Sequence, residues 1–330
     1  MDRLSHRVCV APMMDCTDRH CRYFLRLVAP RVRLYTEMIT TGALKFGNVP
    51  RHLDFDPAEH PVAIQLGGSE PQALAYCARL AEAWGYDEVN LNVGCPSERV
   101  QTGAFGACLM AQPRLVADCV RAMRDGVALP VTVKHRIGID AVEDYGFVRD
   151  FVGIVSEAGA SAFLVHARNA ILKGLSPKQN REVPPLKYGY VHRLKRDFPR
   201  LAIVINGGLV THEAIAAELE HVDGVMLGRA AYHNPYLLAE AEEYAFGIPA
   251  PQRTRAQIVA ALVPYAREQV ARGVPLRAIA RHVLGLYHGA SGSRAWRRTL
   301  CDAARLEHAG PELLLDALRE VEPAAVAEAL

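Results

Sequence analysis

The sequence predicts an α/β protein, a closed (β/α)8 TIM barrel followed by a small C-terminal all-helical domain. Short apolar runs recur along the chain, most of them followed by a helical pattern. Polar residues gather just after these runs, and a Gly- and Pro-rich segment then leads into a stretch with helical patterning alone. The 330 residues, half of them hydrophobic, suffice for a barrel with an appendage.

Eight apolar runs are the predicted strands. They are rich in Val, Ile and Leu and show little alternation, as expected of strands buried on both faces. The runs are Val8–Met13, Val32–Met38, Val62–Leu66, Glu88–Val93, Val131–Val133, Ala162–Val165, Ala202–Ile205 and Gly224–Leu227. The amphipathic segments between them include Gln72–Ala83, Leu115–Arg124, Tyr145–Ala158 and His212–Glu220. An open doubly wound sheet is the alternative, but such sheets normally have fewer strands.

Polar residues follow nearly every predicted strand. The carboxyl ends of barrel strands carry the chemistry in enzymes of this fold, so a set of this kind indicates an active site. The residues are Asp15, Glu37, Gln65, Asn90, Asn92, Cys95, Lys134, Arg136, His166, Arg168, Asn206 and Arg229.

The predicted barrel covers residues 1–247, and the predicted helical domain covers 252–330. The sequence Gly-Ile-Pro-Ala-Pro at 247–251 is typical of a linker. Four helical patterns follow it. The first two are marked by a capping box and helix-end signals, and the others lie near 294–309 and 311–321. The marking residues are Thr254, Gln257, Gly273 and Pro275.

Charge is distributed unevenly. The net charge is only +2, but the segment 253–305 holds ten Arg, no Lys and two acidic residues. This excess predicts a positive surface that binds phosphates.

The eight cysteines include no pair with CxxC spacing, which is typical of a reduced, cytoplasmic chain. The apolar run near the N-terminus is too short for a signal sequence, and no run approaches the 18 residues of a membrane span. We expect a monomer, no membrane association and no metal site.

Two glycine motifs close the predicted barrel. Asn206-Gly207-Gly208 follows the seventh strand, and Gly228-Arg229 follows the eighth. Loops at these places often bind phosphate through backbone N–H groups, and the phosphate of FMN is the natural occupant. The alternative is that the glycines only form tight turns.

Three further strand-end side chains suit a flavin. Lys134 can stabilise negative charge on a reduced flavin or form a Schiff base; the alternative is a surface lysine. Gln65 offers a donor and an acceptor to the pyrimidine edge, and His166 can donate to a phosphate or a substrate.

Cys95 lies in the most informative segment, Asn90-Leu-Asn-Val-Gly-Cys-Pro-Ser97. Pro96 biases the preceding residue toward an extended conformation, which would present the thiol into the barrel mouth. Thiols ordinarily have a pKa of about 8.5, so a protonated thiol can act as a general acid at neutral pH. The alternative is an inert buried cysteine.

Several segments resemble the signature segments of flavin-dependent tRNA-dihydrouridine synthases, in the same order over residues 8–235. They are Val10–Asp15 with Thr17-Asp18, Leu91–Ser97, Val131–Arg136, Val204–Gly208, Asp223–Arg229 and, in the tail, Ser293–Arg298. Residues 166–168 and 175–185 resemble the bacterial A-type branch, which acts at U20 and U20a of the D-loop. His135 departs from the family's more usual Thr or Met, but we expect it to point away from the flavin if Lys134 points in.

The resemblance implies that NADPH reduces FMN, that the reduced flavin transfers hydride to C6 of uracil, and that Cys95 donates the proton to C5. It implies FMN contacts by Pro12, Met13, Met14, Gln65, Lys134, His166, Asn206, Gly207, Gly208, Gly228 and Arg229. It also implies that the helical tail grips tRNA. The candidate RNA contacts are Asn92, Lys178, Arg181, Arg294 and Arg297.

Two other functions remain open at this stage. A flavin barrel acting on a free pyrimidine, like a dihydroorotate dehydrogenase, shares the phosphate loops and Lys134 but leaves the basic tail unexplained. A non-catalytic RNA-binding barrel explains the tail but leaves the flavin residues without a role.

Overall fold

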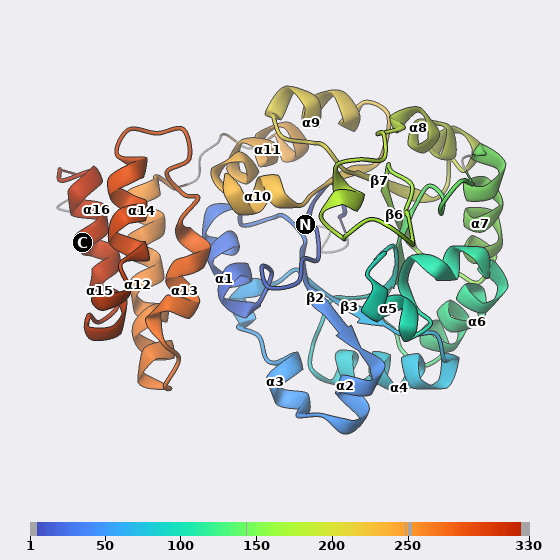
Figure 1. Ribbon diagram of the computed structural model, residues 1–330, viewed down its shortest axis with the longest axis horizontal. Coiled ribbons are helices and arrows are strands. Elements are labelled where there is room, and N and C mark those ends of the chain that lie inside the picture. The colour runs from blue at the N-terminus through green and yellow to red at the C-terminus, as the bar shows by residue number, and fades with distance from the viewer. Residues whose placement is uncertain (1–4, 143, 248, 250–252, 325–330) are drawn as a thin grey trace. The chain divides into compact units, whose positions relative to one another are not determined.

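The computed structural model describes residues 5–142, 144–247, 249 and 253–324 (Figure 1). The chain forms two compact units. The first comprises the residues up to Met14 together with Arg33–Gly228, and the second comprises Asp15–Val32 together with the residues from Arg229 onward. The predicted ranges, 1–247 and 252–330, divide the chain differently, since they assumed that every domain is continuous in sequence. Residues 248, 250 and 251 of the predicted linker lie outside the described residues.

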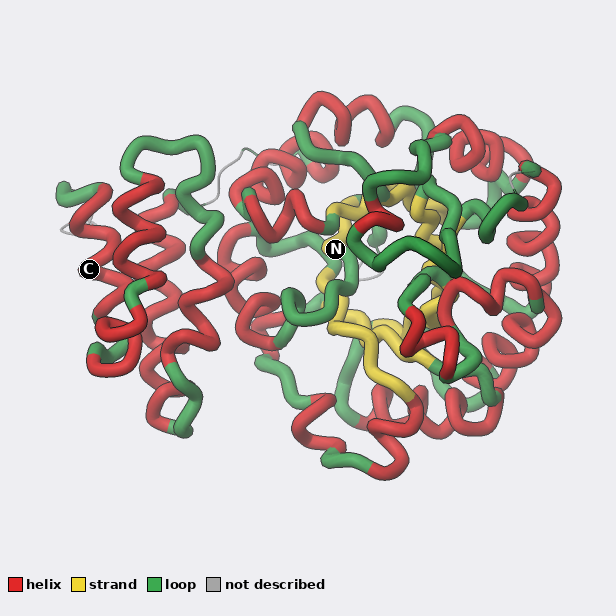
Figure 2. Tube along the Cα trace, in the orientation of Figure 1, coloured by secondary structure: helices red, strands yellow, loops and turns green. Residues whose placement is uncertain are grey.

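The first unit contains an eight-stranded parallel sheet of order β1-β8-β7-β6-β5-β4-β3-β2. Its strands are β1 Val8–Val10, β2 Leu34–Thr40, β3 Val62–Gly67, β4 Glu88–Val93, β5 Val131–Arg136, β6 Ala162–His166, β7 Ala202–Asn206 and β8 Gly224–Leu227. Arg33 closes the ring, because its backbone carbonyl accepts from Val10 N–H at 2.8 Å and its N–H donates to Val8 O at 2.9 Å. The predicted barrel is confirmed, and the open doubly wound alternative is wrong. Figure 2 shows the strands as a ring inside a layer of helices.

Four helices of the first unit, α4, α6, α7 and α9, lie where the amphipathic segments predicted them, to within two residues at each end. Some of these helices begin at side-chain caps: Glu70 accepts hydrogen bonds from the first turn of α4, and Thr211 does so for α9. The helices are α2 Thr41–Phe46, α3 Val49–Leu53, α4 Pro71–Ala83, α5 Glu98–Thr102, α6 Pro113–Arg124, α7 Tyr145–Glu157, α8 Tyr188–Asp197 and α9 His212–Leu219. Short 3-10 helices are η1 Pro57–Glu59, η2 Gly106–Ala111 and η3 Gln179–Arg181.

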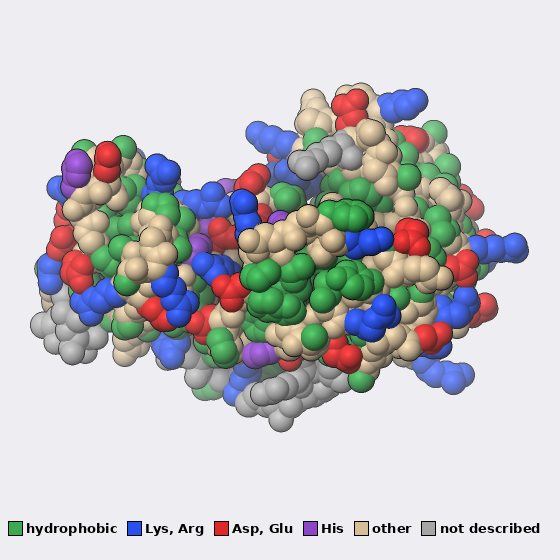
Figure 3. Space-filling model, turned by 90° about the horizontal axis from the view of Figure 1, so that it is seen from below, with side chains coloured by type: hydrophobic (Ala, Val, Ile, Leu, Met, Phe, Trp, Pro, Cys, Tyr) green, Lys and Arg blue, Asp and Glu red, His purple; other side chains and the backbone are tan. Residues whose placement is uncertain are grey.

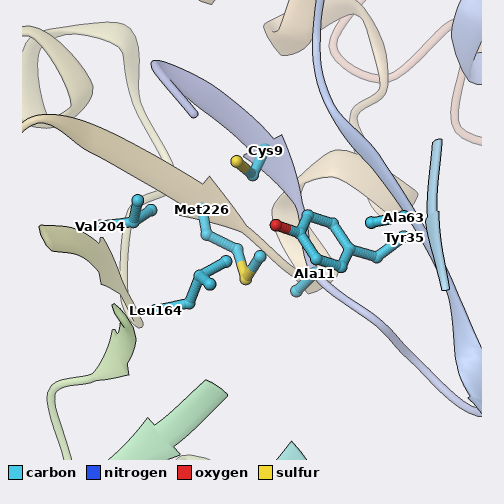
Figure 4. Close-up of a cluster of buried hydrophobic side chains, with 7 residues drawn as sticks. All are labelled: Cys9, Ala11, Tyr35, Ala63, Leu164, Val204 and Met226. Carbon is cyan, nitrogen blue, oxygen red and sulfur yellow. The ribbon is translucent and has the colours of Figure 1, made fainter. Parts of the chain in front are cut away.

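Part of the barrel interior is an apolar core. Side chains from β1, β2, β3, β6, β7 and β8 converge on the barrel axis (Figure 4). The cluster consists of Cys9, Ala11, Tyr35, Ala63, Leu164, Val204 and Met226. An interior filled with apolar side chains is what this fold requires for stability. The interior face of β4 and β5 has no member in this cluster, and polar side chains occupy it instead, as described below.

The second unit is helical. Its helices are α1 Arg19–Val28, α10 Arg229–His233, α11 Tyr236–Phe246, α12 Arg255–Ala271, α13 Leu276–Val283, α14 Ser293–Cys301, α15 Ala303–His308 and α16 Leu313–Val321. The predicted capping box of Thr254 and Gln257 is present at α12. The single helix predicted near 294–309 is wrong: Asp302 divides it, because its carboxylate accepts from the N–H groups of Ala304 and Arg305 and starts α15.

Helix α1 follows β1 in the sequence but packs within the second unit. His20 Nδ1 lies 2.7 Å from the Tyr265 hydroxyl of α12, and the ring of Tyr23 stacks on Tyr265 with centroids 3.8 Å apart. Asp18, which caps α1, lies 3.0 Å from Nε2 of the buried His282 in α13. These contacts explain why Asp15–Val32 groups with the C-terminal helices.

Candidate active site

Three neighbouring strands place polar side chains inside the barrel. Successive residues of a strand face opposite sides, so every second residue of β3, β4 and β5 points inward. Barrel interiors are usually filled with branched apolar residues, and a polar sector on adjacent strands therefore indicates a functional interior. The polar inward residues are Gln65, Glu88, Asn90, Asn92, Thr132, Lys134 and Arg136.

The Cys95 thiol is half-buried in the loop that follows β4. Asn92 Oδ1 accepts from the backbone N–H of Gly94 at 3.1 Å and of Cys95 at 3.0 Å. On the other side, the Cys95 carbonyl accepts from Ala107 N–H at 2.9 Å, in η2. Sγ lies 3.5 Å from the Ser97 hydroxyl. The loop is thus fixed at both backbone polar groups of Cys95, as a positioned proton donor requires.

Arg136 braces the same loop from β5. Its Nε donates to Gly94 O at 3.2 Å, and Nη1 donates to Asn169 O at 3.2 Å and Asn180 O at 3.0 Å. Burial lowers the pKa of Arg136 to about 10. All three of these acceptors are backbone carbonyl oxygens. Within the described residues, no carboxylate therefore neutralises the charge of the Arg136 guanidinium.

Lys134 is a second inward cation on β5. Its Nζ donates to Asn206 Oδ1 at 3.1 Å, and Asn206 Nδ2 in turn donates to Met226 O at 2.7 Å. Burial, with a smaller effect of Arg136, lowers the pKa of Lys134 to about 7. No carboxylate of the described residues forms an ion pair with Lys134. An anionic group bound beside Lys134 would favour its protonated form and balance its positive charge.

His166 and the glycine turn after β7 lie together. Gly207 has φ 115°, and a Cβ there would lie 2.7 Å from His166 Cδ2; Gly208 has φ 74°, and its Cβ would lie 2.5 Å from Leu186 Cδ1. Only glycine fits both conditions. The Tyr188 hydroxyl donates to Gly207 O at 2.6 Å and holds the turn. Sequence reasoning missed Leu186 and Tyr188, since nothing in their local pattern marks them.

His166 is surrounded by positive charge. Burial lowers its pKa well below the ordinary value, and the nearby cations lower it further. These cations are Arg136, Lys134, Arg168 and Arg181. A neutral imidazole among cations, beside a glycine turn, is suited to binding a phosphate.

Most of the predicted cofactor residues lie at one end of the barrel, whereas Arg229 belongs to the second unit. Pro12 and Met13 are half-buried after β1, whereas Met14 is exposed; a Cβ on Gly228 would lie 3.7 Å from Met13 Sδ, an ordinary contact. The residues in the C-terminal halves of barrel strands, or in the loops that follow them, are Gln65, Cys95, Lys134, His166, Asn206, Gly207, Gly208 and Gly228. Arg229, at the start of α10, belongs to the second unit.

The predicted RNA contacts have different settings. Lys178 and Arg181 are exposed at η3, and Arg294 and Arg297 are exposed on α14 in the second unit. Asn92 is buried, and its amide is bound to Gln65 and to the Cys95 loop, so little of it is available to RNA.

His135 points out of the barrel, as expected from its alternation with Lys134. Its ring packs against Phe151 of α7 and Phe163 of β6, with centroids 5.0 and 5.8 Å apart. Nδ1 donates to Arg136 O at 2.6 Å, and burial lowers the pKa of His135 to about 4. This neutral ring belongs to the packing between barrel and helix layer.

Many of the tail arginines are paired. At least five of the ten in segment 253–305 have a carboxylate within ion-pair distance, namely Arg267, Arg272, Arg281, Arg298 and Arg305. Three of the partners, Asp18, Glu312 and Glu320, lie outside that segment in sequence. On the face shown in Figure 3, basic and acidic side chains are interspersed. The local excess of arginine therefore overstates the positive surface.

The described residues also lack two other kinds of feature. They contain no group of three or more His, Cys, Asp or Glu side chains arranged to hold a metal ion. None of their helices has the length and apolar character needed to span a bilayer.

The family model and the similar proteins with known names all indicate dihydrouridine synthases. Residues 9–322 match the family model described as dihydrouridine synthase. A tRNA-dihydrouridine(20/20a) synthase of Pseudomonas putida is 59% identical over 90% of this chain and 88% of its own length. Proteins of the same name from Vibrio parahaemolyticus and Synechocystis are 54% and 56% identical, over 96% and 94% of this chain and 97% and 93% of their own lengths.

Proposed function

Since the chain belongs to the dihydrouridine synthase family, a family of oxidoreductases, we propose that it reduces the C5–C6 double bond of uridines 20 and 20a in the D-loop of tRNA, giving 5,6-dihydrouridine. The positions come from the names of relatives that align along nearly the whole chain. The observation that carries the proposal is Cys95, a half-buried thiol in the loop after β4, which is hydrogen-bonded to Asn92, the residue paired with Lys134 in the neighbouring strand. We further propose that the enzyme acts as a monomer in the cytoplasm.

The residues present fit FMN. Lys134 lacks a carboxylate partner among the described residues, so an anionic ring edge suits it, and the Gly207-Gly208 turn beside His166 suits a phosphate. We propose that the residues named from the resemblance hold it: Pro12, Met13, Met14, Gln65, Lys134, His166, Asn206, Gly207, Gly208, Gly228 and Arg229. Bound there and reduced by NADPH, FMN would supply the hydride for C6 of uracil.

The protein's own residues supply the proton and the placement. The Cys95 thiol donates its proton to C5, from a loop that Asn92 and Ala107 hold in place. The Lys134 ammonium places positive charge in the barrel interior. A uridine in folded RNA is reached only after unstacking, at a cost of a few kcal/mol. Lys178, Arg181, Arg294 and Arg297 are proposed to offset that cost through RNA contacts.

The test is replacement of the proposed proton donor. In Cys95→Ala, turnover with tRNA should fall at least about 100-fold, the size typical of a lost general acid. Flavin absorbance near 450 nm and tRNA affinity should be retained. The control is Cys301→Ala, which removes an exposed thiol and should be fully active.

Normal turnover by Cys95→Ala would show that another group donates the proton. The substrate assignment has its own test: mass spectrometry of tRNA from a strain lacking this protein should show dihydrouridine lost at positions 20 and 20a. Intact dihydrouridine at both, or activity on free uracil, would contradict it.

A further inference from the structure

Glu88 is a buried carboxylate at the start of β4, at the end of the strand opposite to Cys95. Its oxygens lie 2.7 Å from His6 Nε2, 2.8 Å from the Tyr35 hydroxyl and 3.3 Å from Arg33 Nη1. Burial alone would raise its pKa, but His6 and Arg33 hold the pKa of Glu88 at about 2. Glu88 is therefore ionised and can only accept hydrogen bonds.

A continuous row of hydrogen bonds connects this carboxylate to the Cys95 loop. The Thr132 hydroxyl donates to Glu88 at 2.5 Å, and Asn90 Nδ2 donates to Thr132 Oγ1 at 2.8 Å. Gln65 Nε2 then donates to Asn90 Oδ1, and Asn92 Nδ2 donates to Gln65 Oε1, each at 2.8 Å. The row ends where Asn92 Oδ1 accepts from the backbone N–H of Cys95.

Every donor in this row points toward Glu88. The two ends require that direction, because an ionised carboxylate cannot donate and a backbone N–H cannot accept. Between them, each amide has one orientation in which its oxygen and nitrogen both find a partner. Turning one amide over would set two donors or two acceptors face to face inside the barrel. Bonds aligned in one direction also polarise one another.

We propose that Glu88 and Thr132 are positioning residues, which act from the far end of the barrel by setting the amide orientations of Asn90, Gln65 and Asn92 and so fixing the Cys95 loop. The inference rests on the proposed role of Cys95. It also gives the buried Glu88 and Thr132 a part in the reaction, although neither reaches the barrel mouth.

Hydrogen bonds outside the row also hold the Cys95 loop, and they limit how much the turnover rate should fall when the row is broken. Arg136 binds Gly94 O, and Ala107 binds Cys95 O, independently of the row. Breaking the row should therefore displace the thiol without unfolding the loop. A displacement of about 1 Å can cost up to about 100-fold in rate, and we expect about tenfold here.

Thr132→Val and Thr132→Ser form the matched pair of variants. Valine keeps the shape of threonine and removes the hydroxyl that joins Glu88 to Asn90, whereas serine keeps it. With saturating NADPH, the Val variant should lose about tenfold in kcat with an unchanged KM for tRNA. The Ser variant should remain near the wild-type kcat. Thr132→Ala provides the same test if the Val variant does not fold.

A second measurement does not depend on turnover. Iodoacetamide alkylation of the folded protein, followed site by site by mass spectrometry, should be faster at Cys95 in Thr132→Val than in wild type or Thr132→Ser. Alkylation of the exposed Cys301 should be the same in all three.

The outcomes separate the two proposals. Wild-type kcat and wild-type Cys95 alkylation in Thr132→Val would overturn the positioning role. Equal losses in the Val and Ser variants would also overturn it, since the hydroxyl would then be irrelevant. If Cys95→Ala turned over normally, the proposed function would fail, whereas the alkylation result would still decide whether the row fixes the loop.

Discussion

Lys134 is the inward cation whose charge changes near neutral pH. Its pKa is lowered to about 7, while Arg136, at about 10, stays charged and His166, well below its ordinary value, stays neutral. The lowered pKa means that Lys134 loses its proton as the pH rises through about 7 in the free protein. An anion bound beside it favours the protonated amine, so binding takes up a proton above that pH.

We therefore predict that FMN binds more weakly as the pH rises from 7 to 8.5, by at most about tenfold per pH unit. In Lys134→Met, affinity should be lower at pH 6 and should not change over the same window. Titration by quenching of flavin fluorescence measures both. Lys195→Met is the control, because Lys195 is paired with Asp223 instead of facing the site. A wild-type affinity that is flat from pH 7 to 8.5 would remove Lys134 from the flavin contacts.

At the level of single residues, sequence position identified Cys95, at one end of the hydrogen-bonded row, but missed Glu88 and Thr132 at the other end. Cys95, Lys134 and Asn206 were predictable because they follow or end apolar runs. Glu88 and Thr132 lie at the beginnings of strands, and the rule that barrel chemistry gathers at the carboxyl ends of strands does not identify them. The signal was present as the strict alternation Glu-Val-Asn-Leu-Asn-Val in 88–93, which we interpreted as a strand buried on both faces.

Among the elements, η2 matters most for Cys95. Gly106, the first residue of η2, has φ 79°, and a Cβ on it would lie 2.6 Å from Cys95 O and 2.4 Å from Val100 Cγ1. The segment therefore packs directly behind the proposed proton donor. The left-handed backbone and the close approach both require glycine.

Gly106→Ala should destabilise the fold and also slow turnover, because it pushes on the Cys95 carbonyl. The matched control is Gly85→Ala, with φ 88° and no atom within 4 Å of the added Cβ. Both variants bear the left-handed penalty of about 1–2 kcal/mol, which urea unfolding measures. Only Gly106→Ala should lower kcat. Equal kcat values in the two variants would mean that η2 does not position the thiol.

The ends of most strands were predictable from the sequence, but the helix boundary at Asp302 was not. The observed strands end within about two residues of the apolar runs, because buried parallel strands carry Val and Ile on both faces. The exceptions are β1, which stops at Val10, and β5, which continues past Val133 to Arg136. The sequence does not mark Asp302 as a helix start, since an Asp within a helical period fits an exposed helix position as well as an N-cap. Only its bonds to Ala304 and Arg305 decide between the two.

For the whole molecule, the division into units depends on contacts distant in sequence. Helix α1 follows a barrel strand, and a local reading makes it the first barrel helix. Its partners Tyr265 and His282 come more than 200 residues later, and no local pattern predicts them. The acids Glu312 and Glu320, which pair with Arg267 and Arg305, are nearer in sequence, but no local pattern predicts these pairs either.

Those pairings narrow the RNA-binding prediction to exposed arginines such as Arg294 and Arg297 of α14. A cation that contacts a phosphate releases counterions, so each contact adds about 0.7–0.9 to the slope of log affinity against log salt. Arg294→Glu with Arg297→Glu should weaken tRNA binding and reduce that slope by about 1.5. Flavin absorbance should not change.

The control is Arg121→Glu with Arg149→Glu, which makes the same change in net charge. Those arginines lie on α6 and α7 of the barrel unit and are paired with Asp118 and Asp150. If tRNA binding depends on specific phosphate contacts, the control slope stays near that of the wild type while the α14 slope falls. If both pairs reduce the slope equally, binding follows total charge, and α14 has no special part in gripping tRNA.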